Sequence, residues 1–238
     1  MATSLHQQLK AAYAERFGGS TEVSVERFRI DVRAPDRLYE IQQAGLAALR
    51  DKTRRLIRRH DVTIVKPIVR RKRLVRLETP DGPVLSSRSS PKRGVWWHAF
   101  RELIALRSLF PHRRLAIDLV LVDIDELRVP KPRRRFRGKD FEVVDRVLTE
   151  VVETRSIGTV ADVASLLPGP LPESFDTGGL AEAWGIARHE TQTIAYFLRE
   201  VGAITIDGKQ GRSLRYRTTV EKRSRTPAVR RKRTKPAA

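Results

Sequence analysis

RIDVRAPDRLYEIQ, residues 29–42, is the stretch that decides the fold. Residues 34–37 contain Pro and Asp, which favour a turn, and the apolar and polar residues on both sides alternate as they do in strands. The stretch therefore predicts a β-hairpin. Side chains alternate between the two faces of a strand, so Glu40 and Gln42 share one face while Tyr39 and Ile41 share the other.

Two carboxylates converge at the open end of this hairpin if Asp31 faces the same side as Glu40. Together with the backbone carbonyl of Ile41 they offer hard oxygen ligands for Mg²⁺, with water in the remaining positions. Mn²⁺ accepts the same ligands. Acids on strands with apolar neighbours also need a reason to be there, because an unpaired buried carboxylate is costly.

The charge of the chain indicates its partner. Among 238 residues, 48 Lys and Arg stand against 28 acids, a net charge of +20, which favours nucleic acid or an anionic membrane. The most apolar run, Leu115 to Ile124, contains two acids and is too short to cross a bilayer. There is no cysteine and no signal-peptide pattern. We therefore expect a cytoplasmic, nucleoid-associated protein that binds DNA or RNA and no membrane.

The order of elements predicts a mixed α/β domain over residues 1–130. Apolar residues at every fourth position indicate a helix from Ser4 to Phe17 that ends at Gly18. The apolar runs Val62 to Val69 and Leu115 to Val122 are typical of strands buried on both faces. Further expected elements are a strand over 22–32, a helix ending near 60, short strands over 73–77 and 84–85, and a helix over 96–110.

Residues 131–155 predict a basic connector and a helix from Phe141 to Glu153, and the tail 220–238 predicts disorder, since it is basic and has no core. Three acids, Asp123, Asp125 and Glu126, are expected in a solvated loop that pairs with the arginines of the connector.

Residues 156–219 form the last expected domain, with helix, turn, helix and hairpin in succession over residues 176–218. This order resembles the winged helix-turn-helix domains of DNA-binding proteins. In such domains the start of the second helix enters the major groove. The resemblance implies base contacts from Arg188, His189 and Gln192, and phosphate contacts from Lys209 and Arg212 in the wing. A protein-interaction module is the alternative.

The N-terminal region resembles the PD-(D/E)xK nuclease superfamily, which includes restriction endonucleases, junction resolvases and repair and defence nucleases. The resemblance rests on Asp31, eight further residues and then Glu40-Ile41-Gln42, after one helix and before another helix and a buried strand. It implies a restriction-endonuclease-like mixed sheet in which Asp31 and Glu40 hold Mg²⁺ or Mn²⁺. Arg88, Lys92 and Arg93 would grip the phosphates that flank the cut. The whole chain also resembles an uncharacterised bacterial protein family with an EIQ nuclease-like domain, an SPKRG-type segment and a C-terminal winged helix.

Gln42 departs from the superfamily pattern, which usually has Lys at this position. A neutral amide cannot stabilise a developing anion as an ammonium does, so Lys52 or Lys66 would substitute. Lys66 lies in an apolar strand, and the simpler interpretation is an edge lysine whose stem is buried. The superfamily often adds an acid from the first helix; Glu15 faces the wrong way, which leaves His6 and Glu22.

Three functions remain open from the sequence. The first is a metal-dependent DNA endonuclease, with a homodimer if both strands are cut. The second is a non-catalytic DNA-binding regulator with a degenerate nuclease fold. The third is an RNA-binding protein, because a basic surface does not distinguish RNA from DNA.

Overall fold

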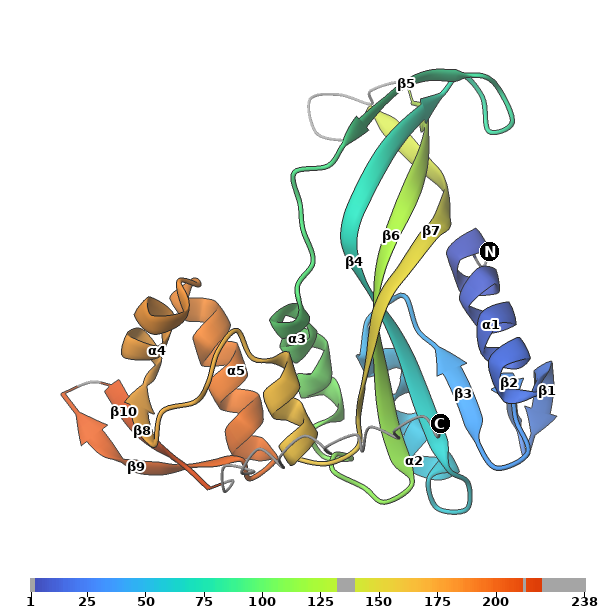
Figure 1. Cartoon of the computed structure of the whole chain (residues 1–238). Coiled ribbons are helices and arrows are strands. Elements are labelled where there is room, and N and C mark those ends of the chain that lie inside the picture. Colours follow the sequence, from blue (N-terminus) through green and yellow to red (C-terminus); the bar gives the residue numbers. More distant parts are fainter. Residues whose placement is uncertain (1–2, 132–139, 212, 220–238) are drawn as a thin grey trace, which may run out of the picture.

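The structure is a computed structural model that describes residues 3–131, 140–211 and 213–219. It has a seven-stranded mixed sheet and, beside it, a smaller unit with a three-stranded sheet (Figure 1). The expected α/β class is confirmed. The predicted tail and most of the basic connector lie outside the described residues. No helix in the described ranges is long and apolar enough to cross a membrane.

The first helix, α1 (Ser4–Phe17), has the predicted bounds. Gly18 ends it in the left-handed conformation, with φ of 60°, which glycine adopts without steric cost. Leu5, Leu9 and Tyr13 are buried and cover one face of the large sheet. The apolar stripe read from the sequence is therefore the face that packs on the sheet.

The predicted hairpin is present as β2 (Phe28–Arg33) and β3 (Leu38–Ile41), which are antiparallel. The strand expected over 22–32 is wrong, because β1 (Ser20–Val25) turns at Glu26 and pairs with β2. Glu26 takes a left-handed φ of 54°. This turn conformation is uncommon for residues other than glycine, so the sequence does not predict it.

The long strands β4 (Val62–Leu77) and β6 (Leu115–Pro130) run parallel to each other, and β3 is parallel to β4. Both continue well past the apolar runs that predicted them. The helix expected from Phe141 to Glu153 is wrong: β7 (Phe141–Ile157) is a strand antiparallel to β6. Its many β-branched residues favour a ladder, and the sheet thus continues past residue 130.

The outer halves of β4, β6 and β7 extend beyond the helices and carry β5 (Val84–Ser89) on the β4 edge (Figure 1). We call this part, residues 70–77, 84–89, 123–130 and 141–148, the arm. The segment after β5 returns along β4, where the Gly94 N–H donates to the Val69 carbonyl oxygen at 2.9 Å. A Cβ on Gly94 would lie 2.3 Å from that oxygen, so only glycine permits this approach.

Short helices cover the face of the sheet opposite α1. They are η1 (Leu46–Leu49) followed by α2 (Arg50–Leu56), and the run η2 (Trp96–Ala99), α3 (Phe100–Leu103) and η3 (Ile104–Leu106). The single helix expected over 96–110 is thus broken into short turns, consistent with the weak helix propensity of its aromatic residues.

The smaller unit begins with η4 (Ala161–Leu166) and has two helices joined by a tight turn. Asp176 caps the first helix by accepting hydrogen bonds from two backbone N–H groups, as expected for an N-cap. Its elements are β8 (Ser174–Asp176), α4 (Thr177–Trp184), α5 (Arg188–Glu200), β9 (Ile204–Gln210) and β10 (Ser213–Thr218), with strand order β8-β10-β9.

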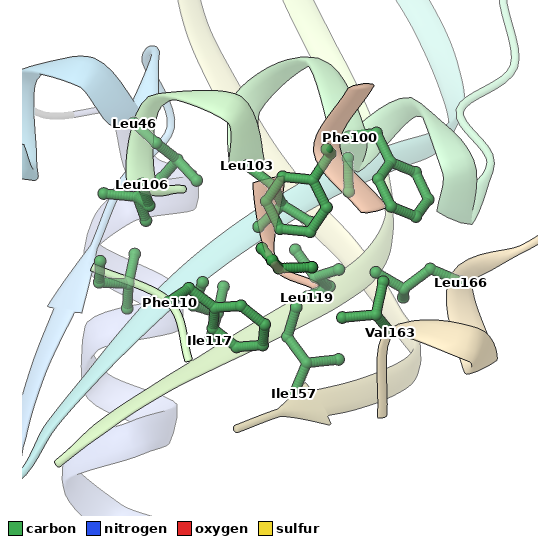
Figure 2. Close-up of a cluster of buried hydrophobic side chains, with 14 of the residues drawn as sticks. Leu46, Phe100, Leu103, Leu106, Phe110, Ile117, Leu119, Ile157, Val163 and Leu166 are labelled. Atoms are coloured by element: carbon green, nitrogen blue, oxygen red, sulfur yellow. The ribbon is translucent and has the colours of Figure 1, made fainter. Parts of the chain in front are cut away.

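One hydrophobic core joins the two units. Phe197 of α5 is fully buried, and its ring centroid lies 5.6 Å from that of Phe100 and 6.2 Å from that of Phe110. Figure 2 shows side chains of the α3 region, β6, the end of β7 and η4 gathered in this cluster. The boundary expected near residue 156 therefore does not separate two cores.

Candidate functional site

The hairpin strands separate at Asp31. Only Val32 and Arg33 of β2 pair with β3, and on the other side the β1 ladder is interrupted at Glu22, opposite Asp31. Glu22 takes a φ of 57°. The Asp31 side chain fills the gap that results: its Oδ2 accepts a hydrogen bond of 2.8 Å from the Ile41 N–H. This bond holds the carboxylate at the open end of the hairpin.

Glu40 is the buried carboxylate of the site. Only 4 % of the residue is exposed, and its Oε2 lies 2.7 Å from the Lys52 Nζ on α2. Its Oε1 is buried without a hydrogen-bond partner among the described residues. Burial raises the pKa of Glu40 to about 7; the Lys52 ammonium opposes this rise and the Asp31 charge adds to it. A buried carboxylate with one unpaired oxygen is a candidate ligand for a cation.

Lys52 therefore lies beside Glu40. Its ammonium also donates to the Arg29 carbonyl oxygen at 2.5 Å, which fixes it between α2 and β2. Gln42 directs its amide elsewhere, since its Nε2 donates to the Gly45 carbonyl oxygen at 3.0 Å. Of the two residues, Lys52 supplies the positive charge beside Glu40.

The expectation that Lys66 is an edge lysine is wrong. It is buried in β4, which lies between β3 and β6. Its Nζ donates to the carbonyl oxygens of Gln43 and Ala44 at 3.0 and 2.7 Å. Burial lowers the pKa of Lys66, opposed by the charge of Glu102. Lys66 thus holds the loop that follows Gln42.

The helix α1 brings His6 and Lys10, one turn apart, to the same side of the hairpin. The His6 Nε2 lies 3.2 Å from Asp31 Oδ1. Lys10, which sequence analysis missed, is buried and forms an ion pair with Glu22, and Arg29 forms a second one. These cations hold the pKa of Glu22 below its usual value. The i, i+4 spacing of His6 and Lys10 was the available signal.

Within the described ranges, no group of three or more His, Asp or Glu side chains is placed to hold a metal ion. The available donors are the two carboxylates, the free Oε1 of Glu40 among them, and the backbone carbonyl of Ile41. This set suits a hard cation that keeps several of its own waters, as Mg²⁺ does.

Residues 3–158 match the model of a family described as a domain of unknown function, DUF8091. The chain belongs to this family. A relative from Treponema pallidum (strain Nichols), described as an uncharacterized protein, is 32% identical over 226 residues, which cover 94% of this chain and 88% of the relative. No solved structure matches the chain. The DUF8091 match spans α1 to β7, so it contains the carboxylate site and the arm.

The structure places the Ser/Pro segment of the DUF8091 domain away from the carboxylates. Arg88 on β5 lies opposite Leu74 of β4, whereas Ile41 lies opposite Val65. Nine residues of strand separate these positions, about 30 Å at 3.3 Å per residue. Arg93 donates to the Ser90 and Lys92 carbonyl oxygens. Arg88 is therefore remote from Asp31 and Glu40, because the long β4 carries it outward. Arg93 lies nearer, since the following Gly94 bonds to Val69, four residues beyond Val65.

The acids of β6 pair within the arm, and the solvated loop expected for them is wrong. Asp123 bonds to Arg70, and Asp125 bonds to Arg73 of the adjacent β4. Glu126 is buried among three cations. Burial raises its pKa, but Lys72 and Arg128 more than offset this and hold the pKa at about 2; the third cation is Arg146.

The helix α5 brings together two of the residues predicted to contact bases. Arg188 and Gln192 line a hollow of about 330 Å³ with Tyr196 and Arg199, one to three turns further along, and with β10. His189 instead lies 3.0 Å from an Arg101 side-chain nitrogen. Lys209 is exposed on β9, and Arg212 lies outside the described residues.

Proposed function

We propose that this protein is a metal-dependent DNA endonuclease that hydrolyses phosphodiester bonds at Asp31 and Glu40. The observation that carries the proposal is the buried Glu40 carboxylate, which has one oxygen free and the other on Lys52, beside Asp31. The order of α1, the β2–β3 hairpin, α2 and β4 also agrees with the order that the PD-(D/E)xK resemblance implies.

Each residue of the carboxylate site has a separate role in the proposed reaction. Asp31, which the Ile41 N–H holds in place, and Glu40, whose charged form Lys52 stabilises, would together hold the cation. When bound, Mg²⁺ or Mn²⁺ supplies a water of lowered pKa and neutralises charge on the phosphate. Lys52 provides the ammonium that Gln42 lacks, next to the anion that develops. His6 contacts Asp31 and limits its rotation.

The smaller unit supports targeting to DNA. Its two helices, tight turn and β9–β10 hairpin have the order of a winged helix-turn-helix, and Arg188 and Gln192 are exposed at the start of α5. Arg and Gln side chains make bidentate contacts with guanine and adenine. On this proposal, α5 and the Lys209 wing select the site and the hairpin carboxylates cut it.

A non-catalytic DNA-binding protein is the second candidate. Three of the four carboxylate oxygens at the site already have protein partners. Asp31 Oδ2 accepts from the Ile41 N–H, Asp31 Oδ1 lies 3.2 Å from His6 Nε2, and Glu40 Oε2 accepts from Lys52. These bonds would give both acids a structural purpose without any metal. Gln42 in place of the usual Lys also favours this candidate.

The deciding experiment measures cleavage of plasmid, linear, single-stranded and branched DNA, and of structured RNA, with Mg²⁺ or Mn²⁺. Wild type is compared with the isosteric variants Asp31→Asn and Glu40→Gln, and with Arg16→Gln on the exposed face of α1 as the control. We expect cleavage by wild type and the control, and loss of cleavage in both carboxylate variants while gel-shift binding persists. Binding without cleavage by wild type on every substrate would establish the second candidate.

A further inference from the structure

A strongly basic hollow lies between the β1–β2 turn and the part of the chain that follows Lys52 in α2. Its volume is about 680 Å³. None of its residues belongs to the set expected to bind nucleic acid. Its lining consists of Arg27, Phe28, Arg54, Arg55, Arg58 and Arg59, with Glu26 as its only acid.

The charges of this hollow are mostly uncompensated. Arg54 pairs with Asp51 at 2.7 Å, and Glu26 lies 3.4 Å from His60. The other four arginines of the lining have no carboxylate within ion-pair distance in the described part of the chain. Guanidinium groups gathered around one hollow repel each other, and an anion bound among them relieves that repulsion.

The hollow begins next to the carboxylate site. Lys52, which contacts Glu40, and Arg55 are three residues apart on α2 and so lie on the same face, within about one helical turn of 5.4 Å. On the strand side, Lys52 bonds to the carbonyl of Arg29, the residue after Phe28. A strand whose phosphate lies at Glu40 therefore has the hollow as its next contact.

The lining favours a nucleic-acid strand over a small anion. The hollow shares Arg59 with a second hollow of about 240 Å³, which Arg33, Arg37 and Arg114 also line together with two acids, Asp36 and Asp61. A path with several separate cations suits a chain of phosphates. Phe28 is partly exposed, and the Arg27 guanidinium lies 5.3 Å from its ring centroid, which resembles the combination of aromatic and cation on which unpaired bases stack.

We propose that this hollow binds the phosphate backbone of the nucleic-acid strand that enters the Glu40 site. The inference rests on the proposed function for the direction of the strand. The inference itself is that the arginines around Phe28 contact phosphates. This contact can be tested independently of cleavage.

The test compares Arg55→Gln combined with Arg58→Gln against a charge-matched control, Arg16→Gln combined with Arg113→Gln, whose residues are exposed and line neither hollow. Fluorescence anisotropy measures the Kd for duplex and single-stranded DNA from 0.05 to 0.3 M salt. Two lost phosphate contacts lower the salt slope by about 2 and weaken binding about 30-fold at 0.15 M salt. We expect both changes for the hollow variant. For the control we expect the weakening of binding to be less than about one third as large.

A second variant localises the strand directly. The chain contains no cysteine, so Arg58→Cys and the control Arg16→Cys each carry one thiol-directed photo-crosslinker. We expect crosslinks to DNA from position 58 and not from position 16, with melting temperatures equal to that of wild type in both.

Equal Kd values for the two double variants, or equal crosslinking from positions 58 and 16, would overturn the inference. So would a loss of binding to phosphatidylserine vesicles in the hollow variant with DNA binding intact, because the site would then serve a membrane. If wild type does not cleave DNA but the hollow variant shows the predicted loss of DNA binding, the proposed function is refuted. The hollow is then still supported as a binding site for nucleic acid.

Discussion

Replacing Glu40 by Gln should stabilise the protein at neutral and alkaline pH, and this result would test the functional interpretation of the site. The pKa of Glu40 rises from 4.5 to about 7 on folding, mainly through burial. The folded protein therefore binds this proton more tightly than the unfolded chain does. Between these two values the free energy of unfolding falls as the pH rises, because ionising Glu40 is harder in the folded state.

The magnitude follows from the two pKa values. Each pKa unit corresponds to 1.36 kcal/mol, so ionised Glu40 lowers the stability by about 3 kcal/mol above pH 7. Gln has the same shape and no charge, and the Glu40→Gln variant should therefore be more stable than wild type by about 3 kcal/mol at pH 8. For a protein of this size that difference raises Tm by about 6–12 °C. Below pH 4.5 the two proteins should unfold alike.

The assay is thermal and urea unfolding of both proteins from pH 4 to pH 8.5, with and without Mg²⁺. Mg²⁺ should raise the Tm of wild type above pH 7 and leave Glu40→Gln unchanged, because a cation that binds only the folded carboxylate stabilises it by mass action. A lower Tm for Glu40→Gln at pH 8 would refute the reasoning. The Glu40 and Lys52 pair would then be a net stabilising ion pair with no need of a functional explanation.

Glu126 provides a matched control of opposite sign, since it is equally buried, at 3 % exposure. Its folded pKa of about 2 lies below the ordinary 4.5, so its stabilisation is complete above pH 4.5 and is lost as the pH falls through about 2. Glu126→Gln should cost about 3 kcal/mol at pH 7. Equal effects of the two substitutions in the same direction would show that burial alone, and not the local charges, governs both sites.

Three further substitutions test the architecture. Phe197→Ala should cost about 3–5 kcal/mol and leave one calorimetric transition, because the two units share a core; two separate transitions would contradict a shared core. Lys66→Met should cost roughly 2–3 kcal/mol and speed amide hydrogen exchange in residues 42–45, and unchanged exchange there would show that Lys66 does not hold this loop. Gly94→Ala should lower the urea midpoint, because the added Cβ would lie 2.3 Å from the Val69 carbonyl oxygen; an unchanged midpoint would argue against this close approach.

The elements that sequence analysis predicted well depend on local signals. The helix α1 has a regular apolar stripe and a glycine at its end, and the β2–β3 hairpin has a Pro-Asp turn between alternating residues. Lys52 could be named because it follows the hairpin on the next helix. For each of these, the residues that determine the structure lie within one or two turns of chain.

The elements that it missed depend on distant partners. Residues of β7 have a spacing compatible with a helix, and their β-branched residues together with the ladder to β6 give a strand instead. The strand expected over 73–77 is present, but its continuity with the strand over 62–69 was missed. The arginines where the two meet pair with Asp123 and Asp125 on β6. Such charge pairs across strands become visible only when the register is known.

The residues of the candidate site also differ in whether local sequence signals identify them. Asp31 and Glu40 could be chosen from the hairpin pattern, whereas Lys66 as a loop anchor and the hollow around Phe28 could not. Lys66 was assigned to an edge because a lysine is unusual in an apolar strand, and the carbonyl oxygens of Gln43 and Ala44 that accept its hydrogen bonds could not be located from the sequence. The arginines of α2 look like an ordinary solvated helix face until the β1–β2 turn closes the hollow against them.

The shared core has a consequence for how cutting and targeting would be coupled. Phe197 and the His189 contact with Arg101 attach α5 to the helices that cover the large sheet. The helix α5 therefore cannot reorient freely, as a domain on a linker could, without exposing a fully buried aromatic side chain. If α5 reads DNA and Glu40 cuts it, the cut falls at a fixed offset from the contacted sequence. The buried docking of α5 therefore fixes the distance between α5 and the carboxylates, whichever of the two candidate functions the protein has.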